Sequence, residues 1–168
     1  MIVRRERPED LPAVRAVVAG AFDAGDGMIP VEVGLLDRLR EDVGWIPRLS
    51  LVAEQEGEVV GHVVATRGRA GERPALGIGP VAVRPDRQGR GIGTALMYTL
   101  LGAAEACDEE LAVLLGEPAF YGRFGFGPGA DHGVTAPEPA WGPHFQVRAF
   151  TRDAPRGTFR YAAPFEEL

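Results

Sequence analysis

Residues 76–103 contain, in order, an apolar segment of strand composition, three closely spaced glycines and a helical pattern. The glycines are Gly89, Gly91 and Gly93, and a helix is expected to begin near Gly91. A strand that leads through glycines into a helix leaves backbone N–H groups free at the positive end of the helix dipole. Glycine has no Cβ, so a ligand can approach the backbone closely. This segment therefore predicts a site for a phosphate or diphosphate group.

Arginines add positive charge to the glycine segment, at Arg84, Arg87 and Arg90. A guanidinium group matches the geometry of phosphate. Three glycines are equally compatible with a tight turn that binds nothing. Two common phosphate motifs do not fit, because the spacing is Gly-x-Gly-x-Gly and the chain contains no lysine. A dinucleotide fingerprint and a P-loop are therefore not expected.

The hydrophobic pattern along the rest of the chain predicts an α/β protein of the α+β type. Strands are expected at 2–5, 49–53, 59–65, 75–83 and 111–115, with short strands at 145–150 and 158–161. Helices are expected after Pro8, around Leu35, Leu36, Leu39 and Val43, from about Gly91, and over Phe120 and Tyr121. The segment 49–83 is typical of an antiparallel meander. With no repeat or long linker, residues 1–168 are expected to form one domain.

Gly79 and Pro80 lie inside the strand expected at 75–83. Proline has no N–H to donate to a neighbouring strand, so it belongs at an edge or in a bulge. We expect a bulge here, immediately before the glycine segment.

The composition excludes several classes of protein. The net charge of −6 argues against binding to nucleic acid, and no apolar run is long enough to span a membrane. The single Cys107 cannot form an internal disulfide, and the N-terminus lacks the apolar core of a signal peptide. A cytoplasmic location is therefore expected. All 18 basic residues are arginine, and together with the many Ala, Gly and Pro residues this indicates a GC-rich coding bias. A bacterial source is expected.

Two blocks of sequence resemble the GNAT superfamily of N-acetyltransferases. The first is Val81-Ala-Val-Arg-Pro-Asp-Arg-Gln-Gly-Arg-Gly-Ile-Gly-Thr-Ala-Leu96, whose Gln88, Gly91 and Gly93 match the acetyl-CoA motif Arg/Gln-x-x-Gly-x-Gly/Ala. The second, Phe120-Tyr-Gly-Arg-Phe-Gly-Phe126, is similar to the family's Tyr-x-x-x-Gly-Phe segment after the fifth strand. The resemblance is specific over residues 76–126 and looser elsewhere.

The resemblance implies a fold and a cofactor. The fold is a mixed, mostly antiparallel sheet flanked by helices and splayed between its fourth and fifth strands, with residues 127–168 supplying C-terminal strands that complete the sheet. The co-substrate is acetyl-CoA, and no metal is implied. The residues expected to bind it are Val81, Ala82, Val83, Gln88, Gly89, Arg90, Gly91, Ile92, Gly93 and Thr94. The Gly79–Pro80 bulge then becomes the device that opens the splay.

The resemblance also implies a reaction, in which a neutral amine attacks the thioester of acetyl-CoA directly. Tyr121 matches the residue that donates a proton to the departing sulfur, and a phenol with a pKa of about 10 keeps that proton at neutral pH. A backbone N–H near Val81 is expected to stabilise the oxyanion. Without the motif, Tyr121 is interpreted as a core aromatic residue.

The general base is not identified by any motif. The strands at 76–83 and 111–115 lack the acidic residue that many family members carry there. The candidates are His62, Glu32, Glu54 and Glu117, and water is the alternative. Asp23 and Asp26, with Glu32, lie between the two N-terminal helices, in a region that borders the acceptor site in this family. They are either acceptor contacts or solvated loop acids.

We therefore predict an acetyl-CoA-dependent N-acetyltransferase that acts on an amine of a small molecule or a protein. The alternative is a catalytically silent acyl-CoA-binding module of the same fold. The three histidines, His62, His132 and His144, lack the spacing of metal ligands. No nucleic-acid or membrane partner is expected, and the resemblance leaves a homodimer open. The sequence does not specify the acceptor amine or the acyl chain.

Overall fold

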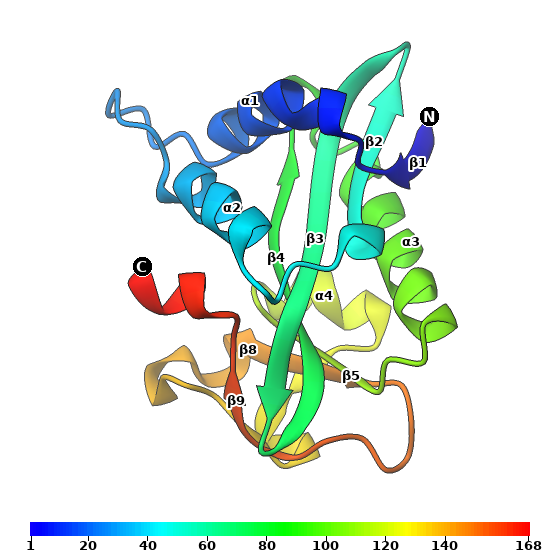
Figure 1. Cartoon of the computed structure of the whole chain (residues 1–168), viewed down its shortest axis with the longest axis vertical. Helices are drawn as coiled ribbons and strands as arrows, with labels where there is room; N and C mark the ends of the chain where they lie inside the picture. Colours follow the sequence, from blue (N-terminus) through cyan, green and yellow to red (C-terminus); the bar gives the residue numbers. More distant parts are fainter.

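The computed structural model describes residues 1–168 and shows a long twisted sheet with helices on both faces (Figure 1). Its helices are α1 (Leu11–Ala21), α2 (Val31–Glu41), α3 (Ile92–Ala106) and α4 (Pro118–Tyr121). Its strands are β1 (Ile2–Arg5), β2 (Ser50–Gln55), β3 (Glu58–Ala70), β4 (Arg73–Val83), β5 (Leu111–Leu115), β6 (Gly127–Pro128), β7 (Val134–Thr135), β8 (Phe145–Ala149) and β9 (Gly157–Arg160). The main path of the sheet runs β1-β2-β3-β4-β5-β8-β6.

Strands β1 to β4 form the antiparallel meander that the sequence predicts. β1 pairs with β2, β2 with β3 and β3 with β4, always antiparallel. The β2–β3 turn uses positive φ angles at Glu56 and Gly57, and glycine adopts such angles without steric cost. The predicted α+β fold with a mostly antiparallel sheet is confirmed.

The predicted bulge at Gly79–Pro80 is also confirmed. Val63 pairs with Val81 and Ala65 pairs with Ile78. One residue of β3 therefore faces two residues of β4, Gly79 and Pro80. The inserted residue bends β4 immediately before its last three positions.

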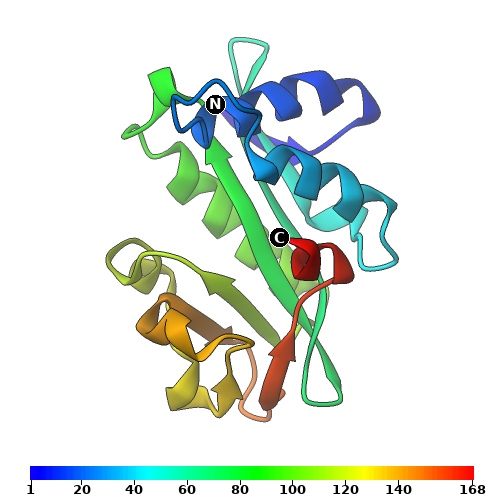
Figure 2. The ribbon, with the colours of Figure 1, turned by 90° about the vertical axis from the view of Figure 1, so that its left-hand side faces the viewer.

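β4 and β5 are paired over a very short length. They run parallel and form only the pairs Leu76–Ala112 and Gly77–Val113. Beyond Gly77 the two strands diverge, and Figure 2 shows the resulting V between β4 (green) and β5 (yellow-green). At the closed end of the V, Arg67 of β3 donates hydrogen bonds of 2.8 and 2.6 Å to the carboxylate of Glu109. The predicted splay between the fourth and fifth strands is confirmed.

The C-terminal strands join the sheet at two separate places. β8 pairs antiparallel with the whole of β5, and β6 continues beyond it. β9 instead pairs with the far end of β3, at Arg69 and Ala70, and β7 pairs with β9. The sequence predicts β8 and β9 to within about two residues but not the two-residue strands β6 and β7.

Two layers of helices cover the sheet. α3 packs on one face with a large apolar cluster that includes Leu49, Leu76 and Leu96. α1 and α2 cover the other face through Val14, Val18 and Leu36. No helix has the length and apolar character required to cross a bilayer.

The expected helix around residues 35–43 begins and ends earlier than the pattern suggests. α2 spans Val31–Glu41, so the assignment of Val43 to its apolar face is wrong, and Val43 is fully exposed. The carboxylate of Asp42 accepts a hydrogen bond from the N–H of Gly44 at 2.7 Å. This local contact competes with continuation of the helix.

A pair of glycine substitutions should test the packing of β9 on β3. A Cβ on Gly68 would lie 2.6 Å from the carbonyl oxygen of Arg160 and 2.6 Å from the ring of Phe159. We expect Gly68→Ala to destabilise the protein by about 1–3 kcal/mol, because β9 must move to accommodate it. The matched control is Gly102→Ala on the exposed side of α3, where a Cβ meets nothing within 4 Å.

Gly102→Ala should stabilise the protein by about 0.5–1 kcal/mol, because alanine loses less conformational entropy in a helix. Urea unfolding followed by circular dichroism measures both changes. Equal stability of the Gly68→Ala variant and the wild type would contradict the packing described for β9.

Candidate functional site

The glycine segment forms the start of α3. Gly91 is the N-cap residue with φ 82°, and Gly89 has φ 74°. The first hydrogen bond of this helix runs from the N–H of Ala95 to the carbonyl of Gly91 at 3.0 Å. The backbone N–H groups of residues 89–94 donate to no protein acceptor. Free donors at the positive end of a helix dipole are the features of an anion-binding helix start.

Gln88 fixes the glycine segment to the end of β4. Its side-chain amide donates a hydrogen bond of 3.0 Å to the carbonyl of Val83. Arg84 is occupied elsewhere, in ion pairs with Asp86 at 2.6 Å and Glu58 at 3.0 Å. Of the three arginines that the sequence points to, Arg87 alone lines the cavity beside the glycine segment.

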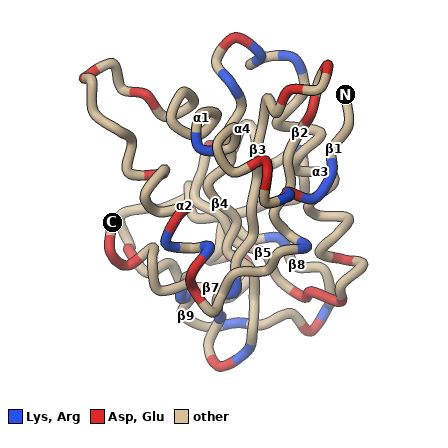
Figure 3. Tube along the Cα trace, turned by 45° about the horizontal axis from the view of Figure 1, so that its top comes forward, with Lys and Arg blue, Asp and Glu red and all other residues tan.

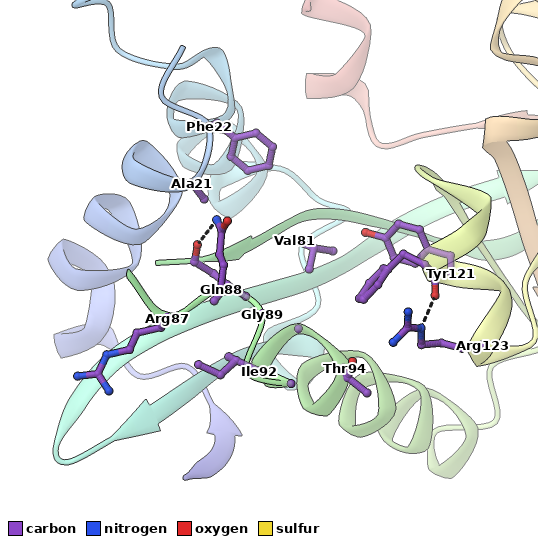
Figure 4. Close-up of a pocket in the computed structure, with 14 residues that line it drawn as sticks. Ala21, Phe22, Val81, Arg87, Gln88, Gly89, Ile92, Thr94, Tyr121 and Arg123 are labelled. Atoms are coloured by element: carbon purple, nitrogen blue, oxygen red, sulfur yellow. Dashed lines mark hydrogen bonds between the residues drawn. The ribbon is translucent and has the colours of Figure 1, made fainter. Parts of the chain in front are cut away.

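A cavity of about 470 Å³ lies between the glycine segment, β4 and α4. Figure 4 shows its walls, with Gln88 and Ile92 at one end and Tyr121 and Arg123 at the other. Nine of the residues predicted from the sequence line it: Val81, Val83, Gln88, Gly89, Gly91, Ile92, Gly93, Thr94 and Tyr121. The structure thus brings together residues that lie up to 40 positions apart in the chain.

Two of the predicted binding residues do not line this cavity. The side chain of Ala82 is buried with Val14 and Val18 on the opposite face of the sheet, because side chains alternate along β4. Arg90 is exposed. A cofactor-binding role for these two residues stays a prediction.

Tyr121 stands where β4 and β5 have separated. Its ring packs edge to face against Phe120, with centroids 4.9 Å apart, and against Phe126 at 6.3 Å. A Cβ on Gly116 would lie 2.3 Å from the Tyr121 ring, so the missing side chain at Gly116 makes room for it. In Figure 4 the Tyr121 hydroxyl points toward Val81. Burial raises the pKa of Tyr121, which keeps the phenol protonated at neutral pH.

A second cavity of about 770 Å³ adjoins the first on the other side of Tyr121. The two cavities share Phe22, Val81 and Tyr121. The larger one extends across the open V, from Pro80 on β4 to Leu115 on β5, and on to the C-terminal segment.

Only one of the four candidate bases lines either cavity. Glu32 lines the larger one. His62 is completely buried, where its Nε2 lies 3.0 Å from the Ser50 hydroxyl and 3.1 Å from the Glu6 carboxylate. Glu54 accepts a hydrogen bond from Arg4 at 2.9 Å. Glu117 is the exposed N-cap residue of α4.

Asp23 and Asp26 line neither cavity. Their carboxylates accept hydrogen bonds from the N–H groups of Gly25 and Met28 and so stabilise the loop between α1 and α2. No group of three or more His, Cys, Asp and Glu side chains is placed to hold a metal ion.

Sequence reasoning missed several residues of the smaller cavity. Phe120 and Arg123 belong to the second family-like block, and the guanidinium of Arg123 lies 4.8 Å from the centre of the Phe120 ring. These two residues could have been predicted from the motif. Ala21 and Phe22, at the end of α1, carry no sequence signal, because about 60 residues separate them from the strand that they face.

Comparison with known proteins supplies the family. The model of the acetyltransferase (GNAT) family matches residues 27–126, more than half of the chain. The chain belongs to the GNAT family of acetyltransferases. It is 31% identical over 161 residues to YhbS of Escherichia coli K12, an uncharacterized N-acetyltransferase, and the match covers 94% of this chain and 92% of YhbS.

Two solved GNAT structures resemble this chain over nearly its whole length. One is a GNAT acetyltransferase from Brucella melitensis in complex with acetyl-CoA, with a TM-score of 0.80 and 35% identity, covering 98% of this chain and 97% of that one. The other is Escherichia coli YhbS in complex with CoA, with a TM-score of 0.87 and 30% identity, covering 98% and 91%. Both relatives are bacterial.

The raised pKa of Tyr121 should be measurable by absorbance at 295 nm during alkaline titration. The difference between the wild type and Tyr121→Phe isolates this one phenol. We expect the midpoint of the difference curve to lie above 10, because burial disfavours the phenolate. Circular dichroism at each pH confirms that the fold persists. A midpoint at or below 10 would show that Tyr121 is in contact with water.

Proposed function

We propose that this chain transfers an acetyl group from acetyl-CoA to the amine of an acceptor, as a single domain that takes in residues 1–168. The support is the family membership together with the full-length similarity to GNAT structures that hold acetyl-CoA or CoA. The residues that line the two adjoining cavities come from segments spread between Ala21 and Leu168, so distant parts of the chain contribute to one site.

The smaller cavity fits the phosphate-bearing part of CoA. The N–H groups of residues 89–94 have no protein acceptor. Gly89 and Gly91 have no Cβ that would keep a phosphate away from these groups. Arg87 and Arg123 are the only charged side chains in its lining, so the lining carries two positive charges. The end of β4 at Val81 and Val83 lines this cavity and has no partner in β5. It therefore offers backbone groups to the amide-bearing arm of CoA.

The observation that carries the proposal is the position of Tyr121 and Val81 on the wall between the two cavities. A thioester that reaches this wall from the smaller cavity meets an amine that enters from the larger one. Holding two reactants in such proximity supplies a large part of the rate acceleration. The chain's one thiol, Cys107, lines neither cavity. Direct attack by the amine, with no acyl-enzyme, is therefore the favoured route.

Tyr121 has the properties of a proton donor for this reaction. Acetyl-CoA supplies an activated acyl group. When the acyl group passes to the amine, CoA leaves as a thiolate, and its sulfur needs a proton. The Tyr121 hydroxyl is directed into the site and its pKa is raised by burial. A backbone N–H at Val81 is the proposed donor to the carbonyl oxygen as negative charge develops on it. The proton of the attacking amine passes to Glu32 or to water.

The first test concerns the glycine segment. Gly91→Val places a branched side chain where the phosphates approach, so calorimetry should show acetyl-CoA binding weakened by about 100-fold or more. Valine also strains a residue with positive φ. The control is therefore Gly25→Val in the exposed α1–α2 loop, where φ is 74° and the residue lines neither cavity.

The control should bind acetyl-CoA like the wild type. Equal affinity of the Gly91→Val variant and the control would remove the glycine segment from the site. Circular dichroism on both variants checks that they remain folded.

The second test concerns Tyr121. Tyr121→Phe keeps the packed ring but removes the proton, so turnover should fall by about 10²- to 10⁴-fold while acetyl-CoA affinity holds. Tyr98→Phe is the matched control, since Tyr98 is 55% exposed on α3 and lines neither cavity. Release of CoA thiol measures both. Unchanged turnover in Tyr121→Phe would contradict the role of Tyr121.

The same assay separates the enzyme from the alternative predicted from sequence. Tight binding of acetyl-CoA without acetylation of any amine in a broad panel would identify a silent acyl-CoA-binding module.

A further inference from the structure

The larger cavity differs in charge from the smaller one. Its charged side chains are Glu32, Glu138, Glu166 and Arg160, which leaves a net charge of −2 against +2 in the smaller cavity. None of these carboxylates appears in an ion pair, whereas the adjacent Glu167 pairs with Arg38 at 3.1 Å. Figure 3 shows acidic positions of α2 and of the C-terminal segment on the same side of the molecule. A cation is therefore favoured over an anion in this cavity.

Six of the twenty residues that line the larger cavity are aromatic. Twelve of its twenty lining residues are hydrophobic. Tyr161 is at the centre of the aromatic group, with its ring centroid 4.7 Å from Phe159, 4.8 Å from Phe165 and 6.3 Å from Trp141. A Cβ on Gly77 would lie 2.7 Å from the Tyr161 ring, so the ring lies directly on β4. Flat aromatic surfaces favour a ligand with an aromatic or apolar body.

More than half of the wall of this cavity lies outside the part of the chain that the family model matches, because Phe22 precedes residue 27 and ten further residues follow residue 126. These ten come from residues 137–141, from β9 and Tyr161, and from the last four residues of the chain. The C-terminal segment therefore shapes the larger cavity together with residues of the N-terminal half, such as Glu32.

The volume of the larger cavity sets the size of the acceptor. About 770 Å³ falls in the range of small-molecule sites. The cavity is also continuous with the wall that carries Val81 and Tyr121. A ligand of this size can therefore place an amine at that wall while the rest of the molecule contacts the rings.

We propose that the acceptor is a small primary amine carried on an aromatic body, held by the rings around Tyr161 and drawn in by the acidic side chains that include Glu32. This inference rests on the proposed function for the reaction but concerns the ligand class of the larger cavity. Glu32 contacts the acceptor itself, because its carboxylate attracts the ammonium form that predominates at neutral pH. The amine then loses a proton before it attacks.

The first experiment compares amines on the wild-type protein. The probes are 2-phenylethylamine, tryptamine, ethylamine and a lysine-containing peptide with a blocked N-terminus. We expect kcat/KM for the two aromatic amines to exceed that for ethylamine and for the peptide by about 10- to 100-fold, because burial of the ring adds to binding. Equal or higher kcat/KM for ethylamine or for the peptide would overturn the proposal.

The second experiment measures binding without chemistry, by calorimetry on protein saturated with CoA. Glu32→Gln should weaken the binding of 2-phenylethylamine by about 3- to 10-fold, because the carboxylate is partly solvated and acts only on the charge of the ligand. The affinity for the uncharged 2-phenylethanol should not change. The matched control is Glu41→Gln at the other end of α2, an exposed glutamate that lines neither cavity. An equal loss for both probes would assign Glu32 a structural role and contradict the proposal.

These measurements distinguish failure of the inference from failure of the proposed function. Binding of 2-phenylethylamine without acetylation would refute acetyl transfer and support the ligand class. Acetylation of all amines at similar rates would support the transfer and refute the ligand class. A gain in kcat/KM with octanoyl-CoA over acetyl-CoA, without preference among amines, would show that the larger cavity holds the acyl chain and would also refute it.

Discussion

Most of the site depends on the fact that β4 and β5 pair at only two positions. If the strands stayed paired to their ends, the ladder would close the space that both cavities occupy and would cover the edge of β4. The pairs at Leu76 and Gly77 and the Arg67–Glu109 ion pair hold the strands together at one end. The bulge at Gly79–Pro80 then turns β4 away, and proline removes one donor that a neighbouring strand would need.

The open V also explains why glycines recur at positions far from the phosphate segment. Gly116 makes room for the ring of Tyr121, and Gly77 makes room for the ring of Tyr161. Each glycine lets an aromatic ring lie directly against the backbone of a diverging strand. The two rings therefore take fixed positions on either side of the opening, and burial raises the pKa of both phenols.

The sequence predicts features that depend on local chemistry and misses those that depend on distant packing. β1, β5 and the start of α3 follow from short apolar runs and glycines, and the Gly79–Pro80 bulge follows from a missing N–H. Helical spacing from Ile92 and Leu96 puts Thr99 on the apolar face of α3, but the buried face lies about one residue further along. Thr99 is exposed and bonds back to Ala95, while Met97 and Leu101 are buried. α3 packs against β2 and β3. Helical periodicity alone does not predict which side chains face these strands.

The candidate site divides in the same way. The acetyl-CoA motif predicts eight residues that line the smaller cavity, because a glycine-rich helix start has a short sequence signature, and the second block adds Tyr121. The larger cavity has no such signature. Phe22, Glu32 and Trp141 come from three separate parts of the chain, and only the folded sheet brings them together. Of the four candidate bases, sequence alone could not distinguish Glu32 from the buried His62, because both depend on which face of the sheet each element covers.

The wall that the two cavities share makes their ligands thermodynamically dependent on each other. Phe22, Val81 and Tyr121 each face both spaces. A ligand that shifts the Phe22 or Tyr121 ring while it occupies one cavity changes the shape of the other. Thermodynamic reciprocity then requires each ligand to change the affinity of the other by the same factor. Any coupling between the two ligands thus passes through three side chains that belong to neither cavity alone.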